Sequence, residues 1–401
     1  MVRFFDAIVV GAGPIGGYLS RKLNEFGHSV LLLEEHNEIG RPFQCAGLVN
    51  PAAMKTIGLE DSILTPIWGA NIHSPSGKRV SIGDPEVPRT FSVCRKIFDE
   101  AVVKQSIATG TEIQLSTKPI SAKIEDEYVE VNIDGPNGAE TVRCKVLCGA
   151  DGAHSWVRRK FKMGSPTETM IGFQIEVTGY TGDEGMLDMY TGSGIAPGFF
   201  SWAIPTGVTT RLGTWTKANL MNGISSEHFM SRLMEDPVLN SRFAECSEVG
   251  RFCGPVPSGI VRRPMRQRVA LFGDAAGICK PTTGGGIGPG FKQVEMLIGP
   301  LSQAINDNDL SDARMKKIAT KLKEMKRDQR KKRALRDAFL TEMDDSELES
   351  VFAVWARPEV TEIINEFGDI ENPIPLGIKM LREVPEFRRL AGRAAKAILW
   401  S

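Results

Sequence analysis

The fold is decided by Val9-Val10-Gly11-Ala12-Gly13-Pro14-Ile15-Gly16-Gly17, which joins a short apolar run to an apolar, helix-like segment. Residues 6–10 are expected to form a buried strand, and Gly11 lets the chain turn tightly into a helix. Gly13 has no side chain, so a pyrophosphate can approach the backbone there, and Gly16 lets the helix pack on the strand. The first N–H groups of that helix carry partial positive charge. The stretch therefore predicts a dinucleotide site.

An acidic residue follows at the distance that a βαβ unit requires. The run from His28 to Glu34 is strand-like, and Glu34 ends it. In this position a carboxylate accepts hydrogen bonds from the ribose of an adenosine. Glycine spacing alone is a weak signal, but the strand, the helix and the acid together indicate a nucleotide cofactor.

Length and composition exclude several classes of protein. The 401 residues are enough for two or more domains. Lys and Arg together number 49, as do Asp and Glu, so no nucleic-acid partner is expected. Apolar runs fall far short of the roughly 20 residues that cross a bilayer, and no signal sequence precedes Asp6. The protein is therefore expected in the cytoplasm.

The seven cysteines do not form a recognisable framework. Their number is odd, they are scattered, and none forms a CxxC pair. In a chain of this length such a pattern predicts neither a disulfide framework nor an iron–sulfur cluster. No metal site is expected.

Charge is uneven along the chain although it sums to zero. Between Arg314 and Arg336 twelve Lys or Arg residues face only Glu324 and Asp328. Two interpretations remain open. The stretch is either a solvated helix face or a surface that docks an acidic redox protein or anionic lipid headgroups.

Two further motifs follow in order. Asp151-Gly152-x-x-Ser155-x-Val157-Arg158 lies where a strand is expected to run into a helix. Gly273-Asp274-Ala275-Ala276 ends a buried strand, and Pro281-Thr282-Thr283-Gly284-Gly285-Gly286-Ile287 opens a helix. With the first glycine stretch, this ordered set resembles the superfamily of FAD-dependent hydroxylases and reductases. Asp274 is suited to receive a ribityl hydroxyl of the flavin. The glycines would let backbone N–H groups face the flavin's N1 and C2 carbonyl.

The resemblance implies an α/β fold. A Rossmann-like FAD-binding domain of the glutathione-reductase or hydroxylase type is expected, interrupted by a β-rich substrate domain and followed by a C-terminal helical region. The FAD-binding domain is expected to be discontinuous, over residues 1–65, 92–165 and 265–310. The β-rich domain is expected over 66–91 and 166–264, and the helical region over 311–401.

Finer features resemble one branch, the geranylgeranyl reductases of archaeal type. Residues 38–48, Glu-Ile-Gly-Arg-Pro-Phe-Gln-Cys-Ala-Gly-Leu, resemble the segment in which that family places a cysteine beside the flavin. Residues 197–205 resemble its Pro-x-x-Tyr-x-Trp-x-Phe-Pro substrate motif. They depart from it at Phe200, which replaces Tyr, and at Ile204, which replaces Phe. The first change removes a hydroxyl, so any role of that hydroxyl is in doubt here.

Together, the glycine stretch and the resemblance assign a set of site residues. The positions expected to contact FAD are Gly11, Gly13, Ile15, Gly16, Glu34, Arg41, Cys45, Ala46, Gly47, Arg95, Pro119, Asp151, Asp274, Gly286 and Ile287. The positions expected to line an apolar substrate channel are Phe199, Phe200, Trp202 and Ile204, although core strand residues would look the same. Cys45 is the expected catalytic residue, as a thiol that orients substrate or relays a proton. Its alternative is a small cysteine that merely packs.

The activity that the resemblance implies is saturation of geranylgeranyl double bonds in isoprenoid glycerophospholipids, as a step of membrane-lipid synthesis. Reduced FAD would deliver hydride from N5, and the protein would supply a dry channel and a proton source. The chain has no second dinucleotide cradle, so the electron donor stays open between a ferredoxin and NAD(P)H. The basic, amphipathic tail Phe387–Trp400 is expected to pack on the protein or to seat it on the inner face of a membrane.

Two other functions remain open on the same scaffold. The first is an aromatic-ring monooxygenase, which would react with oxygen; residues 38–48 and 197–205 disfavour it. The second is a non-catalytic flavoprotein that transfers electrons or binds prenyl lipids without reducing them.

Overall fold

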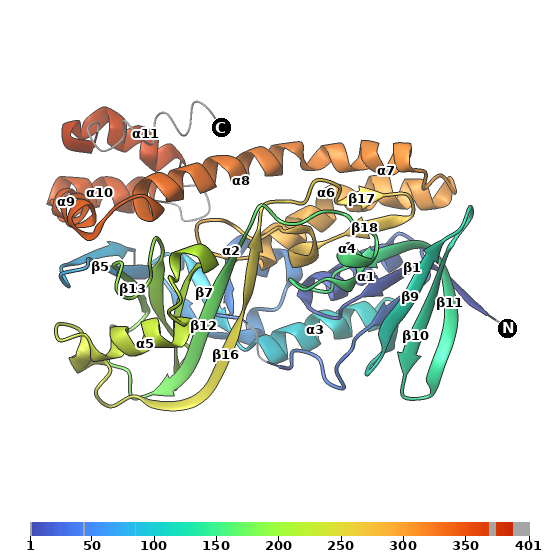
Figure 1. The fold of residues 1–401 in the computed structure, drawn as a ribbon, viewed down its shortest axis with the longest axis horizontal. Coiled ribbons are helices and arrows are strands. Elements are labelled where there is room, and N and C mark those ends of the chain that lie inside the picture. Colours follow the sequence, from blue (N-terminus) through green and yellow to red (C-terminus); the bar gives the residue numbers. More distant parts are fainter. Residues whose placement is uncertain (1, 43–44, 85, 369–373, 388–401) are drawn as a thin grey trace.

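The computed structural model describes residues 2–42, 45–84, 86–368 and 374–387. Two sheets stand side by side along the long axis of the molecule, and helices of the C-terminal region run along one edge of both (Figure 1). The α/β fold class is confirmed. Among the described residues, no helix is long and apolar enough to cross a membrane.

The first sheet begins with the glycine stretch and is parallel at its centre. Its strand order is β17-β18-β11-β1-β2-β8, and a β9–β10 hairpin continues antiparallel from β11. The register pairs Val9 of β1 with Leu32 of β2 and Cys148 of β11. The strands are β1 (Arg3–Val10), β2 (Val30–Leu33), β8 (Glu112–Gln114), β9 (Lys118–Ile124), β10 (Val129–Gly135), β11 (Gly138–Gly149), β17 (Met265–Arg266) and β18 (Val269–Leu271).

The strands of this sheet are apolar on both sides, so both faces of the sheet are covered, and helices cover one of them. The core on that face joins residues of α1 (Pro14–Glu25), α2 (Pro51–Ile57), α3 (Arg95–Ala108) and α6 (Ile287–Asn306). The opposite face packs against the β9–β10 hairpin and α4 (Trp156–Lys160). A parallel sheet covered on both faces is the usual setting for a ligand at the carboxyl ends of the strands.

The second sheet is largely antiparallel and has the order β16-β12-β15-β14-β13-β5-β6. One face packs against α5 (Ser226–Glu235). Its strands all fall within 66–91 and 166–264, although the proposed domain boundaries themselves stay a prediction. They are β5 (Gly69–His73), β6 (Arg79–Gly83), β12 (Glu168–Thr178), β13 (Met186–Thr191), β14 (Phe200–Pro205), β15 (Thr210–Lys217) and β16 (Ser247–Ser258). A small third sheet has the strands β3 (Leu48–Val49), β4 (Ile63–Ile67) and β7 (Thr90–Val93), which precede and follow β5 and β6 in the sequence.

The C-terminal region is helical, as the sequence predicts. The long helix α8 follows α7 and crosses from the first sheet to the second (Figure 1). The expected tail helix over Phe387–Trp400 lies, from residue 388 on, outside the described residues. The elements are α7 (Asp312–Ala319), α8 (Lys323–Arg336), a π-helical turn η6 (Asp337–Thr341), α9 (Asp345–Trp355), α10 (Pro358–Phe367) and α11 (Ile374–Glu383).

The basic stretch of residues 314–336 includes α8, and the cations of α8 lie on two faces of the helix, one exposed and one buried. Lys323, Arg327 and Arg330 are exposed and line a shallow surface hollow with Glu324 and Lys326. Arg333 and Arg336 point inward, and the Arg336 side chain is only 1% exposed. Neither a solvated helix face nor a docking surface accounts for the whole stretch, because the inward cations make contacts inside the protein.

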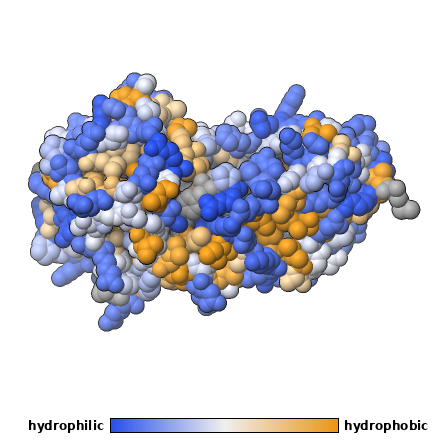
Figure 2. All heavy atoms as spheres, turned by 90° about the horizontal axis from the view of Figure 1, so that it is seen from below, coloured by the Kyte–Doolittle hydropathy of each residue, from blue (hydrophilic) through white to orange (hydrophobic). Residues whose placement is uncertain are grey.

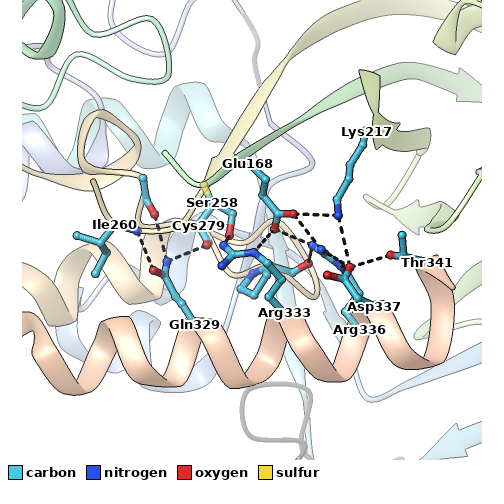
Figure 3. Close-up of polar contacts among 12 residues, drawn as sticks. Glu168, Lys217, Ser258, Ile260, Cys279, Gln329, Arg333, Arg336, Asp337 and Thr341 are labelled. Atoms are coloured by element: carbon cyan, nitrogen blue, oxygen red, sulfur yellow. Dashed lines mark hydrogen bonds and ion pairs between the residues drawn. The ribbon is translucent and has the colours of Figure 1, made fainter. Parts of the chain in front are cut away.

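The inward cations converge on Glu168 at the start of β12 (Figure 3). Arg336 makes a bidentate pair with the Glu168 carboxylate at 2.8 and 2.9 Å, and Arg333 Nε adds a contact at 2.8 Å. Burial alone would raise the pKa of Glu168, but the hydrogen bonds and charges of Arg336 and Arg333 lower it to about 2. The ion pairs therefore tie α8 to the second sheet.

We expect Glu168→Gln to destabilise the protein at neutral pH by roughly 3 kcal/mol, because two inward guanidinium groups lose their carboxylate. The pKa of Glu168 in the folded protein lies below its ordinary value of 4.5. This contribution is therefore present above pH 4.5 and is lost as the pH falls toward 2. Thermal unfolding should show a gap between wild type and variant that narrows as the solution is acidified.

The matched control is Glu112→Gln, which removes an exposed carboxylate from Arg3. Exposed pairs contribute at most about 1 kcal/mol, so this change should barely move the melting temperature. A Glu168→Gln loss that stays constant from neutral to acid pH would contradict the ion-pair account.

Candidate functional site

The glycine stretch forms the tight turn that the sequence predicts. Gly11 has φ +99°, and a Cβ there would lie 2.5 Å from the carbonyl oxygen of Ala150. A Cβ on Gly16 would lie 1.8 Å from the carbonyl oxygen of Gly11. Any side chain at either position would collide with backbone, so the start of α1 is pressed against the end of β1.

Gly13 differs from its neighbours because its missing side chain would point into open space. A Cβ at Gly13 meets no atom within 4 Å. Gly13 is also the N-cap of α1, and no side chain caps this helix. The N-terminus of α1 thus offers backbone N–H groups beside an opening, which is how proteins bind phosphate.

Glu34 follows β2 and lies against the same turn. Its Oε2 accepts a hydrogen bond from the N–H of Ala12 at 2.9 Å. Its Oε1 accepts from the backbone N–H of His36 at 3.1 Å. The carboxylate is therefore fixed beside the glycine turn, and its contact with a ribose stays a prediction.

Asp151 of the second motif acts locally as a helix cap. Its carboxylate accepts from Ser155 Oγ at 2.6 Å and from the N–H of Val157 at 3.0 Å, at the start of α4. The motif's Arg158 donates to the carbonyl oxygen of Ala275 at 3.0 Å. The second and third motifs are therefore joined, whereas a direct contact of Asp151 with FAD stays a prediction.

Asp274 lies in a 3-10 turn, η4 (Gly273–Ala276), directly after β18. Burial raises the pKa of its carboxyl group, and one oxygen accepts a hydrogen bond from Cys279 Sγ at 3.0 Å. A Cβ on Gly286 would lie 2.8 Å from the same oxygen. Gly286 is the N-cap of α6 and provides no side-chain cap. Asp274 and the open N-terminus of α6 therefore lie together.

Ile15 holds the first and third motifs against each other. Its side chain is 3.1 Å from the position of a Cβ on Gly273 and 2.4 Å from that on Gly290. The Ile15 side chain therefore packs α1 against α6. Any contact of Ile15 with FAD would come from its backbone and stays a prediction.

Cys45 lies within residues 38–48, the segment that resembles the geranylgeranyl reductases. The two residues before it, Phe43 and Gln44, lie outside the described residues. Its Sγ accepts from the N–H of Gly47 at 3.3 Å. It also hydrogen-bonds the Arg95 side chain. Arg95 makes a bidentate pair with Asp99 at 2.8 and 2.7 Å. Burial alone would lower the pKa of Arg95. The interactions with Asp99 and Cys45 outweigh burial and raise this pKa, so the guanidinium stays charged.

Arg211 of β15 fixes the backbone next to Cys45. It donates to the carbonyl oxygens of Ala46 at 2.9 Å and Val93 at 3.0 Å. A Cβ on Gly47 would lie 2.2 Å from its guanidinium. The second sheet therefore positions the segment of residues 45–47.

The predicted substrate residues lie on β14, where side chains alternate between two faces. Phe200, Trp202 and Ile204 share the face opposite α5 and join two apolar clusters. Trp202 donates from Nε1 to Gln174 at 3.3 Å and lies flat over Gly213. Phe199 precedes the strand and is 2% exposed, with Arg336 4.8 Å from its ring centre. Phe199 is thus a core residue beside α8.

Two further predicted cofactor residues lie in segments next to these groups. Arg41 is exposed in the loop between β2 and β3, and Pro119 is buried in β9. A Cβ on Gly40, beside Arg41, would lie 2.6 Å from Cα of Lys96 in α3. The N–H of Thr117, two residues before Pro119, donates to the carbonyl oxygen of Glu34 at 2.8 Å. The contact of both predicted residues with FAD stays a prediction.

Comparisons with known proteins agree with this geometry. Residues 5–196 match the FAD binding domain family. A digeranylgeranylglycerophospholipid reductase of Methanocaldococcus jannaschii is 27% identical over 356 residues, covering 86% of this chain and 89% of that protein. The chain is an FAD-dependent oxidoreductase, and its sequence is similar to that of this reductase. A second such reductase, of Methanosarcina acetivorans, is 29% identical over 337 residues, covering 80% and 81%.

The fold of this flavoprotein has a close structural counterpart. The crystal structure of a geranylgeranyl bacteriochlorophyll reductase-like protein from Thermoplasma acidophilum has a TM-score of 0.86 and 21% sequence identity. The likeness covers 98% of this chain and 100% of that one. The interrupted FAD-binding fold is therefore shared over the whole length.

The residues present fit FAD. The opening at Gly13 and the uncapped start of α1 suit a pyrophosphate. The uncapped start of α6 beside the buried Asp274 suits a second polar group of the cofactor. When bound and reduced, FAD supplies a hydride, and the chain's own groups bind and orient it.

Several residues that build the site are absent from the sequence predictions. Gln293 is fully buried, accepts from the N–H of Gly273 at 2.9 Å and donates to the carbonyl oxygen of Leu271 at 3.0 Å. Asp99, four residues after Arg95 on α3, could have been found from the i, i+4 spacing of opposite charges. Arg211 lies far from Cys45 in the sequence and gave no local signal.

We expect Gly13→Ala to weaken FAD binding at least 10-fold, about 1.4 kcal/mol, without destabilising the apoprotein. The reason is that the added methyl group meets no protein atom but occupies the opening at the start of α1. Titration with FAD gives the Kd, and thermal unfolding of apoprotein gives the stability.

Gly250→Ala serves as control because a Cβ at Gly250, in β16, also meets nothing within 4 Å. It should change neither quantity appreciably. Wild-type FAD affinity of Gly13→Ala would contradict the placement of the pyrophosphate.

Proposed function

We propose that this flavoprotein saturates carbon–carbon double bonds in the prenyl chains of glycerophospholipids. The observation that carries the proposal is an apolar face of the second sheet that meets the Cys45 segment. Ala46 and Leu48 pack in one cluster with Ile204 and Trp202. The named activity of the relatives described above supports the same substrate class.

Saturation of an isolated double bond requires few polar side chains. An isolated alkene takes up a hydride on one carbon and a proton on the other, and no carbonyl polarises it. The chain must therefore exclude water, hold each double bond close to the flavin and supply the proton. The face of Phe200, Trp202 and Ile204 is suited to the first two tasks, and the Cys45 thiol next to Arg95 is suited to the third.

The test is anaerobic incubation of photoreduced holoenzyme with a geranylgeranylated glycerophospholipid. Mass spectrometry should show gains in steps of two hydrogens while the flavin is reoxidised. Flavin that stays reduced until oxygen is admitted would overturn the proposal. Oxygen uptake and NAD(P)H oxidation with a phenolic substrate would instead favour a monooxygenase.

If Cys45 delivers the proton, Cys45→Ala should keep FAD bound and slow saturation about 100-fold, the usual scale of general acid catalysis. Cys45→Ser retains a hydroxyl donor of similar size and should recover part of the rate. The measurement is single-turnover reoxidation of the flavin by the lipid. An unchanged rate in Cys45→Ala would leave Cys45 as a packing residue.

We also propose an acidic protein, of the ferredoxin kind, as electron donor, docking on the exposed face of α8. Lys323, Arg327 and Arg330 form a basic hollow there. Charge of one sign on a surface raises the association rate of a partner of opposite charge. If NAD(P)H is the electron donor instead, this face of α8 plays no part in the reduction of the flavin.

We expect Arg327→Glu combined with Arg330→Glu to lower the rate of reduction by such a donor about 10-fold at low ionic strength. Its dependence on salt should also flatten, because two attractive charges are reversed. Reduction by dithionite, a small reagent, should stay unchanged and serves as the control. Stopped-flow flavin absorbance measures both. Equal effects on donor and dithionite would contradict docking on this face.

A membrane lipid as substrate also implies contact with a membrane surface, and we propose that this contact is peripheral. Large apolar side chains are exposed at Ile97 and Ile107 of α3 and at Val208, which is 92% exposed. Figure 2 shows apolar patches among hydrophilic residues on one face of the molecule. Co-sedimentation with phospholipid vesicles should retain the holoenzyme, and its absence from the pellet would exclude the contact.

A further inference from the structure

The inner face of α8 lies against the loop that joins Asp274 to α6. This loop, residues 277–286, follows η4 and ends at the N-cap of α6. Residues 329, 333 and 336 share one face of α8 because they are spaced by four and three positions. Figure 3 shows these side chains extending from α8 toward the loop and toward Glu168.

Gln329 makes the most extensive contact with the loop. Its Nε2 lies 3.1 Å from each of three successive carbonyl oxygens, those of Gly277, Ile278 and Cys279. Its Oε1 accepts from the N–H of Ile260 at 3.0 Å. The residue is 5% exposed. A buried amide is tolerated only when such partners are present, so its position and that of the loop determine each other.

Other contacts leave the loop little freedom. Arg336 donates to the carbonyl oxygen of Pro281 at 2.8 Å. On the opposite side, a Cβ on Gly284 would lie 3.0 Å from the Trp215 ring. The loop is thus held between α8 and the apolar face of the second sheet, and its Cys279 carries the hydrogen bond to Asp274.

We propose that Gln329 is a positioning residue for the flavin end of the cofactor site. By holding three carbonyls of the 277–286 loop, it sets the place of Asp274 and of the open N-terminus of α6. The C-terminal helix α8 is therefore part of the FAD site although it contributes no residue to the three motifs. The inference rests on FAD binding and is independent of the lipid substrate.

The experiment compares Gln329→Met with wild-type holoenzyme in the absence of substrate. Methionine keeps the size of the side chain but removes the amide N–H donors that face the three carbonyls and the acceptor of the Ile260 N–H. We expect the FAD Kd to rise about 10-fold. The flavin absorbance should shift, and the midpoint potential should become more negative, because a displaced helix N-terminus stabilises the anionic reduced flavin less.

The matched control is Gln303→Met, the same change at an exposed glutamine on α6 that bonds only Asp307 in the structure. It should leave all three flavin properties unchanged. Gln329→Glu keeps the acceptor for Ile260 but loses the donors, so it should resemble Gln329→Met. It decides the question if Gln329→Met does not fold.

A Gln329 variant with wild-type FAD affinity, absorbance and potential overturns the proposal, even if its apoprotein melts at a lower temperature. That result would leave Gln329 with a purely structural role. The lipid-saturation proposal would be untouched, since none of these measurements uses the substrate.

Discussion

The contact on which the structure depends is the approach of α1 to the turn after β1. Gly16 can come so close to the Gly11 carbonyl only because it has no Cβ, which would lie 1.8 Å from that oxygen. The same device recurs where Ile15 presses on Gly273 and Gly290. Two helices, α1 and α6, are therefore packed together through glycine, and both begin without a side-chain cap. The FAD site is a consequence of these bare helix ends.

The second sheet buries a polar network on the face that packs against α5. There, Asp188 accepts a hydrogen bond from Nε2 of His73 at 2.7 Å and one from the Tyr180 hydroxyl at 2.8 Å. These polar groups are satisfied among themselves, and His73 and Asp188 are buried. The opposite side carries the apolar Phe200 and Trp202. Two buried polar side chains share that side: Gln174 accepts from Trp202 at 3.3 Å, and Arg211 donates to the carbonyl oxygen of Ala46 at 2.9 Å. The apolar face that approaches the Cys45 segment is therefore interrupted by a guanidinium group.

The parts of the site that were predictable are those whose causes are local. The turn at Gly11, the helix from Ile287 and the alternation over Phe200, Trp202 and Ile204 each depend on residues within one element, so their spacing reveals them. The Gly16 contact was predictable for the same reason. The assignments of Arg41, Pro119 and Asp151 came from a resemblance and stay predictions, and the Asp151 carboxylate also accepts hydrogen bonds from Ser155 and Val157 at the start of α4.

The parts that escaped prediction are long-range. Arg336 meets Glu168 across 168 positions of sequence, and Gln329 meets Cys279 across 50. Nothing in the sequence around Gln329 or Arg336 distinguishes an inward cation or amide from an exposed one, because all residues of α8 but Met325, Ala334 and Leu335 are polar. Only the packing of the helix decides which side chains are buried.

This packing also changes the meaning of the basic stretch. A run of twelve cations suggests a uniform surface, yet Arg333 and Arg336 pair with Glu168, and Arg336 pairs also with Asp337. The exposed cations of α8 itself are Lys323, Arg327 and Arg330, separated from the Gln329 contact only by the width of the helix, roughly 10 Å. The basic hollow that we propose as the docking surface for an acidic donor and the Gln329 contact with the 277–286 loop thus lie on opposite faces of one helix. A protein with zero formal net charge can in this way carry a strong local field at the edge of its cofactor site.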